Sequence, residues 1–233
     1  MTSPYYQRFS LKQRIEHFLG MSAFILLSLT GFPQKFFDTG WAKAIVGSLG
    51  GVGATRMIHR GCGLIFGALF VFHFATNIAM LFDRRRASFA LVPTRKDFSD
   101  AVATLKYYLG LTEKTPRFDR FDYRQKFEYW GLSAGAVIML ITGLILYLPT
   151  LVTRLLPGEL IPAAKVAHSS EGLMALLVVV LWHIYNAHLN PDVFPFDTTI
   201  FTGKISRERM LHEHPLELER LERTPGGPSK PES

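Results

Sequence analysis

Four long stretches without a charged side chain constrain this chain more than any other feature. They cover residues 17–34, 61–82, 129–153 and 172–191, and so run for 18, 22, 25 and 20 residues. A helix needs about 20 mostly apolar residues to cross a bilayer core about 30 Å thick. The sequence therefore predicts four transmembrane helices and excludes an ordinary water-soluble domain.

The expected fold is all-α, an integral membrane four-helix bundle. We expect its helices over about residues 12–32, 57–82, 126–149 and 163–190, all within a single domain of residues 1–223. Residues 224–233 are rich in proline and glycine and are expected to form a flexible tail. An amphipathic pattern over residues 96–111 predicts a further short helix on the cytoplasmic surface.

The basic residues are distributed unevenly along the chain. Of the 26 Lys and Arg, 20 lie in the N-terminus, in residues 83–126 and in the tail from Leu189. Under the positive-inside rule these segments are cytoplasmic, so both termini are expected there. The net charge of +7 therefore fits the membrane topology and contacts with membrane lipid, and it does not indicate that the chain binds nucleic acid. The expected location is the bacterial inner (cytoplasmic) membrane, as a multi-pass protein. The single cysteine, Cys62, excludes a disulfide framework and a cysteine-ligated cluster.

Histidines mark the interior of the predicted bundle. Ionisable residues are costly inside a bilayer and usually serve a function there. His59 and His73 are 14 residues apart in the second span, and His168 and His183 are 15 apart in the fourth. At 100° per residue these spacings return to within about 40° and 60° of the starting face, about 21–23 Å along the axis. Since the two spans run in the same direction, their histidines are expected to lie at matching depths.

Imidazoles paired across a helix bundle are typical axial ligands of haem iron. The spacing predicts two b-type haems, an outer one between His59 and His168 and an inner one at the level of His73 and His183. Gly63 and Gly172, four residues after the outer histidines, are expected to let the flat macrocycle lie close. Zinc fits less well, because its sites need three or four ligands close together. The alternative is a haem-free membrane anchor or transporter with structural histidines.

Four further histidines lie outside these four positions. His17, at the inner end of the first span, competes with His73 for the inner haem. His188 is five residues, about 140° around an α-helix, from His183. We therefore assign His188 to a quinone, propionate or structural contact, and a further haem through His73 or His188 stays open. His212 and His214 lie in the tail, where we expect them to be solvated.

The order of these motifs resembles the di-haem cytochrome b subunits of respiratory formate dehydrogenases, nickel-iron hydrogenases and thiosulfate reductases. The motifs that carry the resemblance are Arg14-Ile-Glu-His17, Met57-Ile-His59-Arg-Gly, Ala167-His168-Ser-Ser-Glu-Gly172, Trp182-His183-Ile-Tyr, Gln125-Lys126 with Tyr129-Trp130, and Thr202-Gly203 with His212-Glu-His214-Pro215. The resemblance covers roughly residues 10–220.

The resemblance implies axial ligands for each haem. It assigns the outer haem to His59 and His168, and the inner haem to His17 and His183. We favour His17 over His73 because the motif around His17 is intact. His73 itself departs from the family pattern, which leaves open a swapped ligand, a quinone contact or an extra haem.

The resemblance also implies a quinone beside the inner haem, at Asp122, Arg124 and Gln125. These residues have a plainer interpretation as charges at the membrane interface. The expected function is to anchor a complex and pass electrons between a redox subunit on the outer face and the quinone pool. That partner would be an Fe–S protein or multihaem c-type cytochrome, joined to a catalytic subunit. A self-contained transmembrane reductase is a further alternative.

Overall fold

The computed structural model describes residues 5–82, 89–191 and 193–223. Contacts within the chain divide it into two compact units. The bundle unit is Ile15–Phe82 with Leu132–Phe196, and the polar unit is Met1–Arg14, Asp83–Gly131 and Asp197–Ser233. The expectation of a single domain over residues 1–223 stays a prediction, and the expected tail, residues 224–233, lies outside the described residues.

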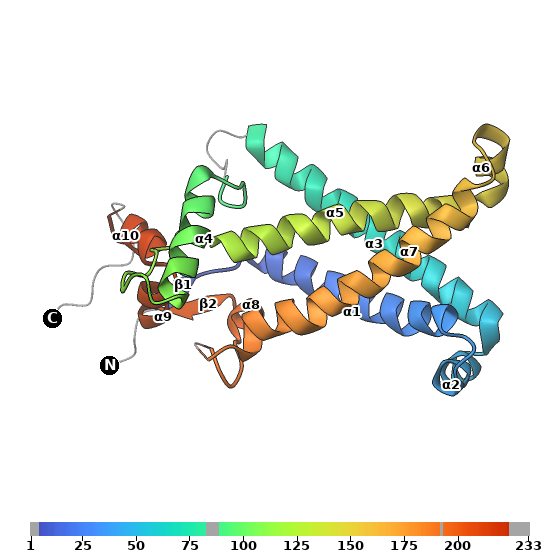
Figure 1. Ribbon diagram of the computed structural model, residues 1–233, viewed down its shortest axis with the longest axis horizontal. Coiled ribbons are helices and arrows are strands. Elements are labelled where there is room, and N and C mark those ends of the chain that lie inside the picture. The colour runs from blue at the N-terminus through green and yellow to red at the C-terminus, as the bar shows by residue number, and fades with distance from the viewer. Residues whose placement is uncertain (1–4, 83–88, 192, 224–233) are drawn as a thin grey trace. The chain divides into compact units, whose positions relative to one another are not determined.

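Four long helices form the bundle unit and run along one another in Figure 1. They are α1 (Leu11–Lys35), α3 (Gly51–Phe82), α5 (Tyr123–Tyr147) and α7 (Leu160–Leu177) with its continuation to Leu189. Each is long and apolar enough to cross a membrane. The prediction of an all-α membrane bundle is therefore confirmed. The helices begin up to six residues before the expected positions, because helical backbone continues past the charged residues at the membrane edge.

Short elements connect the long helices at one end of the unit. Helix α2 (Gly40–Ser48) lies between α1 and α3, and α6 (Pro149–Leu155) lies between α5 and α7. Gly50 and Gly51 join α2 to α3 with φ of 89° and 90°. Glycine takes this left-handed conformation at no steric cost, so a tight turn can form here.

Small residues let the long helices approach closely. A Cβ added to Gly63 would lie 3.9 Å from Leu27 Cδ2, and one added to Gly172 would lie 3.6 Å from Met139 Cε. Both glycines therefore face a neighbouring helix, as is common where membrane helices pack. The expectation that these glycines let a macrocycle lie close stays a prediction.

The fourth span changes its winding along its length. After α7 it is π-helical over η1 (Val178–His183) and η2 (Tyr185–Leu189). In π-winding the hydrogen bonds join residues five apart, so such residues lie close to one turn from each other. His183 and His188 lie in two successive π-helical stretches, so the angle of about 140° expected from regular α-helical geometry does not apply unchanged here.

The polar unit packs around a small sheet. Strand β1 (Tyr5–Gln7) pairs antiparallel with β2 (Lys204–Ser206), with Tyr6 opposite Ile205. Helices α9 (Arg207–Glu213) and α10 (Pro215–Arg223) follow β2, and the buried core contains Tyr6, Ile205, Met210 and Leu218. The unit also holds α8 (Thr199–Thr202) and α4 (Arg95–Tyr108), which confirms the short helix expected over residues 96–111.

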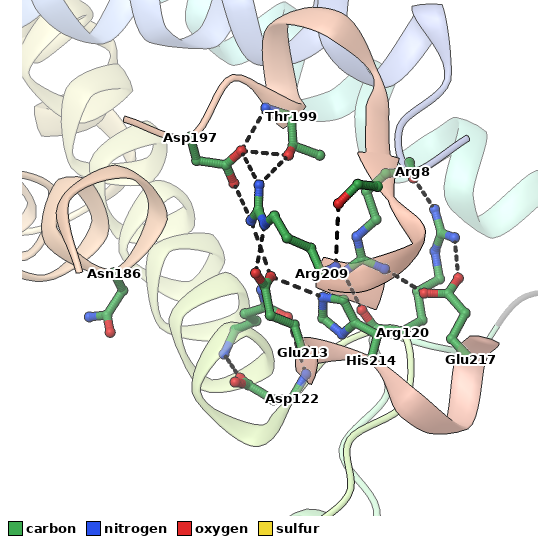
Figure 2. Close-up of polar contacts among 12 residues, drawn as sticks. Arg8, Arg120, Asp122, Asn186, Asp197, Thr199, Arg209, Glu213, His214 and Glu217 are labelled. Carbon is green, nitrogen blue, oxygen red and sulfur yellow. Dashed lines mark hydrogen bonds and ion pairs between the residues drawn. The ribbon is translucent and has the colours of Figure 1, made fainter. Parts of the chain in front are cut away.

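Buried charges tie the segments of the polar unit together (Figure 2). The guanidinium of Arg8, only 3% exposed, donates to Glu217 Oε2 at 2.6 Å, and Arg120 donates to Glu217 Oε1 at 2.6 Å. Burial lowers the pKa of Arg8 to about 10, although the charge of Glu217 opposes this. A second network joins Arg209 to Asp197 and Glu213. Residues from the N-terminus, the central loop and the tail are thus held in one ion-paired cluster.

His214 belongs to this cluster and is 5% exposed. Its Nδ1 lies 2.9 Å from the backbone carbonyl oxygen of Asp119 and donates to it. The expectation that His214 is solvated was wrong, because α9 and α10 fold back onto the loop and enclose the ring. His212, two residues earlier, is exposed as expected.

Candidate functional site

The outer candidate site is a pair of histidines on two different helices. His59 projects from α3 and His168 from α7, and their ring centroids are 6.3 Å apart with planes at 80°. Both rings lie inside the bundle unit and are only partly exposed. The structure thus brings together the two residues that the sequence pairs at this depth.

Each outer histidine contacts a threonine and a glycine of a neighbouring helix. Thr30 Oγ1 lies 2.9 Å from His59 Nδ1, and Thr142 Oγ1 lies 3.0 Å from His168 Nδ1. A Cβ on Gly31 would come within 3.0 Å of His59 Cε1, and one on Gly143 within 3.3 Å of His168 Cε1. The glycines therefore provide the space that the rings occupy.

The inner candidate site pairs His17 of α1 with His183 of η1. Their ring centroids are 6.1 Å apart, and the planes are tilted by 35°. His183 sits in the π-helical part of the fourth span. Such local π-winding frequently marks functional positions in helices. The structure brings together the two residues that the family resemblance pairs.

His73 has other neighbours. Its Nδ1 lies 3.0 Å from Glu16 Oε2, and its Nε2 lies 2.9 Å from Asn77 Nδ2. Both ring nitrogens are thus within hydrogen-bond distance of protein groups. This geometry supports the histidine pair implied by the resemblance over the pair of His73 with His183.

The two histidine pairs have the separation that bis-imidazole iron ligation requires. An imidazole nitrogen lies about 2.0 Å from a first-row metal ion, and the ring centre about 1.15 Å behind the nitrogen. Two imidazoles that hold one metal ion between them would therefore have ring centres about 6.3 Å apart. The observed 6.3 and 6.1 Å match this value. Among the described residues no group of three or more His, Cys, Asp and Glu is placed to hold a metal ion.

Two further polar residues lie in the fourth span. The His188 ring stacks on Phe196, with centroids 4.4 Å apart and planes at 5°. Glu171, one turn after His168, packs against Gly135 of α5 so closely that an added Cβ would lie 2.3 Å from its Oε1. Placing an ionisable side chain such as that of Glu171 inside a membrane span costs free energy. Because Gly135 has no side chain, it leaves the space that the Glu171 carboxylate occupies.

The candidate quinone residues lie at the start of α5, in the polar unit. Asp122 Oδ1 accepts from the Gln125 backbone N–H at 2.9 Å, and Gln125 Oε1 accepts from the Asp122 N–H at 3.1 Å. This reciprocal pair is a capping box, which satisfies two backbone donors at a helix start. Arg124 Nη2 donates to Asp122 Oδ2 at 2.7 Å. The three residues therefore form one local cluster with a clear structural role.

Sequence reasoning missed the residues that support the histidines. Thr30, Thr142 and Glu16 were not singled out, although one signal for the threonines is present. The segments Leu29-Thr-Gly-Phe32 and Ile141-Thr-Gly-Leu144 repeat a Thr-Gly pair in the first and third charge-free windows. A polar residue beside glycine, at the same place in two apolar spans, indicates a shared contact.

Four membrane-spanning helices that enclose two facing imidazole pairs define a class, the integral membrane cytochromes that carry b-type haem. Comparison with known families agrees with this. Residues 8–193 match the model of the prokaryotic cytochrome b561 family, and the chain belongs to that family. It is therefore a membrane cytochrome b that takes part in electron transfer, in the bacterial inner membrane. Membership sets aside the haem-free anchor or transporter.

Curated relatives belong to one of the kinds of cytochrome b subunit that the sequence motifs resemble, the formate dehydrogenase subunits. The chain is 27% identical over 183 residues to the formate dehydrogenase cytochrome b556(fdo) subunit of Escherichia coli K12, which covers 77% of each chain. It is 24% identical over 174 residues to the formate dehydrogenase cytochrome b556 subunit of Haemophilus influenzae, covering 75% of this chain and 67% of that one. The resemblance to cytochrome b subunits is confirmed.

Proposed function

We propose that the chain is a membrane-anchoring di-haem cytochrome b subunit. It passes electrons between a redox partner on the outer face and the membrane quinone pool. The observation that carries this proposal is the pair of imidazole separations, 6.3 Å and 6.1 Å, which suit two bis-histidine haem irons. When bound, a b-type haem supplies a centre that accepts and gives up one electron at a time.

The residues of the chain hold and orient the two cofactors. His59 and His168 are the proposed axial ligands of the outer haem, and His17 and His183 those of the inner haem. His73 is assigned to a hydrogen-bonded chain with Glu16 and Asn77, and no further haem is assigned to it. His188, which stacks on Phe196, is assigned a structural role beside the inner pair.

The relatives' names support a partner of the proposed kind. Both are cytochrome subunits of a formate dehydrogenase, so each belongs to a complex with its catalytic chemistry on another subunit. We propose the same division of labour here, with an Fe–S protein or multihaem c-type cytochrome on the outer face. The bias of basic residues supports cytoplasmic termini and an outer face at α2 and α6.

The proposed quinone contacts are Asp122, Arg124 and Gln125. Because Asp122 and Gln125 also cap α5, alanine variants would test capping and quinone binding together. Gln125→Glu keeps an acceptor for the capping box and removes the neutral amide donor. Gln125→Glu is expected to slow electron exchange with a quinol analogue while the spectra of both haems stay unchanged. Parental rates with quinol in this variant would place the quinone elsewhere.

Haem stoichiometry tests the ligand assignment. Purified protein is expected to contain two haems per chain by the pyridine haemochrome assay. His168→Ala and His17→Ala should each remove one haem, because each deletes one of two axial ligands. His73→Ala, the matched control at the inner level, should keep both. Haem loss that follows His73 and spares His17 would overturn the inner assignment, and a chain without Soret absorbance would overturn the whole proposal.

A further inference from the structure

The two threonines beside the outer histidines have the same hydrogen-bonding arrangement. Thr30 Oγ1 donates to the Leu26 carbonyl at 2.7 Å, and Thr142 Oγ1 donates to the Ile138 carbonyl at 2.6 Å. Each is a bond from the hydroxyl to the carbonyl four residues earlier in its own helix. A carbonyl can only accept, so the single hydroxyl proton of each threonine is already committed.

This arrangement fixes the tautomer of both rings. With its proton given to a carbonyl, Thr30 Oγ1 can only accept from His59 Nδ1, 2.9 Å away. The same holds for Thr142 and His168 Nδ1 at 3.0 Å. Each Nδ1 thus carries the hydrogen, and each Nε2 keeps its lone pair.

We propose that Thr30 and Thr142 are positioning residues that set the tautomer of His59 and His168 and lower the midpoint potential of the outer haem. This inference rests on the proposed ligation of that haem. A hydrogen bond from the distal ring nitrogen makes a metal-bound imidazole more basic and fixes its orientation. A more basic imidazole stabilises ferric over ferrous iron, so the outer haem is held at lower potential than without the threonines.

The glycines beside the threonines complete the arrangement. Gly31 and Gly143 lie against Cε1 of His59 and His168, where a Cβ would come within 3.0 and 3.3 Å. The Thr-Gly pair therefore supplies both an acceptor for the ring and the space for it. Since one pair lies on α1 and the other on α5, the outer site is supported symmetrically from two helices that carry no outer ligand.

Conservative variants separate this role from packing. Thr30→Val and Thr142→Val keep the shape and delete the acceptor, whereas Thr30→Ser and Thr142→Ser keep the hydroxyl. The matched control is Thr55→Val, because Thr55 is 0% exposed and donates to the Gly51 carbonyl at 2.9 Å in the same manner. Each variant is purified as the full chain, assayed for haem and titrated electrochemically in the visible region.

Both valine variants are expected to keep two haems and to raise the midpoint potential of the outer haem. Each valine variant removes one of the two threonine acceptors at the outer site. This loss should weaken the preference of the outer haem for the ferric over the ferrous state about threefold to tenfold, which is roughly 30 to 60 mV for a one-electron couple. The inner haem, identified by its titration in His168→Ala protein, should not move. The serine variants and Thr55→Val should titrate as the parent.

Three results would overturn the inference. They are parental potentials in fully loaded valine variants, serine variants that shift as far as the valine variants, and an equal shift in Thr55→Val. If the valine variants lose the outer haem while the serine variants and Thr55→Val retain it, the positioning role is supported by haem content instead. A parent chain with fewer than two haems would be a failure of the proposed function and is recognised before any variant is compared.

Discussion

Acidification is expected to open the polar unit through His214. The ring is 5% exposed, and burial together with the charge of Arg8 lowers its pKa from 6.5 to about 4. An open form, in which the ring meets water, binds more protons than the closed form between pH 4 and 6.5. The free energy of opening is therefore highest above pH 6.5 and decreases as the pH falls from 6.5 to 4.

The size of the effect follows from the two pKa values. Between pH 7.5 and pH 5 the loss is about 2 kcal/mol, which corresponds to about 30-fold more of the open form. Asp119 and Asp197 also have lowered pKa values, because hydrogen bonds from Arg220 and Arg209 outweigh burial. Their ordinary value of 3.8 lies below this window, so both contribute little within it.

Hydrogen–deuterium exchange of α9 and α10 measures this opening directly, once rates are corrected for the intrinsic effect of pH. Exchange in these helices should rise about 30-fold from pH 7.5 to pH 5. His214→Gln should flatten the profile, while His212→Gln, two residues away and exposed, should retain it. An acid-dependent rise that persists in His214→Gln would refute the assignment to this ring.

Two further predictions concern buried contacts. Glu217→Ala should destabilise the polar unit by about 3–5 kcal/mol in a thermal or denaturant unfolding assay, because it leaves a buried guanidinium unpaired. Glu219→Ala, at a side chain 44% exposed, should destabilise the unit far less, because an exposed ion pair contributes little to stability, and equal losses would contradict the argument. Gly135→Ala should displace Glu171, since its Cβ would lie 2.3 Å from Oε1, and lower the yield of folded, haem-loaded protein. Gly131→Ala, where a Cβ meets nothing within 4 Å, is the control and should leave that yield unchanged.

The membrane bundle and the outer histidine pair were predictable from the sequence for a physical reason. A bilayer excludes charge over a fixed thickness, so the four windows appear in the sequence as gaps between charged residues. Regular α-helical geometry then places His59 and His168 at matching depths. Both inferences depend only on spacing along single helices.

Other features depend on contacts that spacing does not contain. The fourth span is π-helical around His183 and His188, and no local feature of the sequence predicts this winding. The burial of His214 arises because α10 folds back onto a loop more than 90 residues earlier, where Asp119 lies. The role of His73 depends on Glu16, which comes from a different helix. Each of these required the tertiary structure.

Each proposed site is divided between the two halves of the bundle. His17 and His59 come from the helical hairpin of α1 and α3, whereas His168 and His183 come from the hairpin of α5 and α7. A nascent chain that has inserted only its first hairpin therefore holds half of each ligand set. On the proposed ligation, both cofactor sites would be complete only once the second hairpin has inserted, and each bound cofactor would then join the two hairpins.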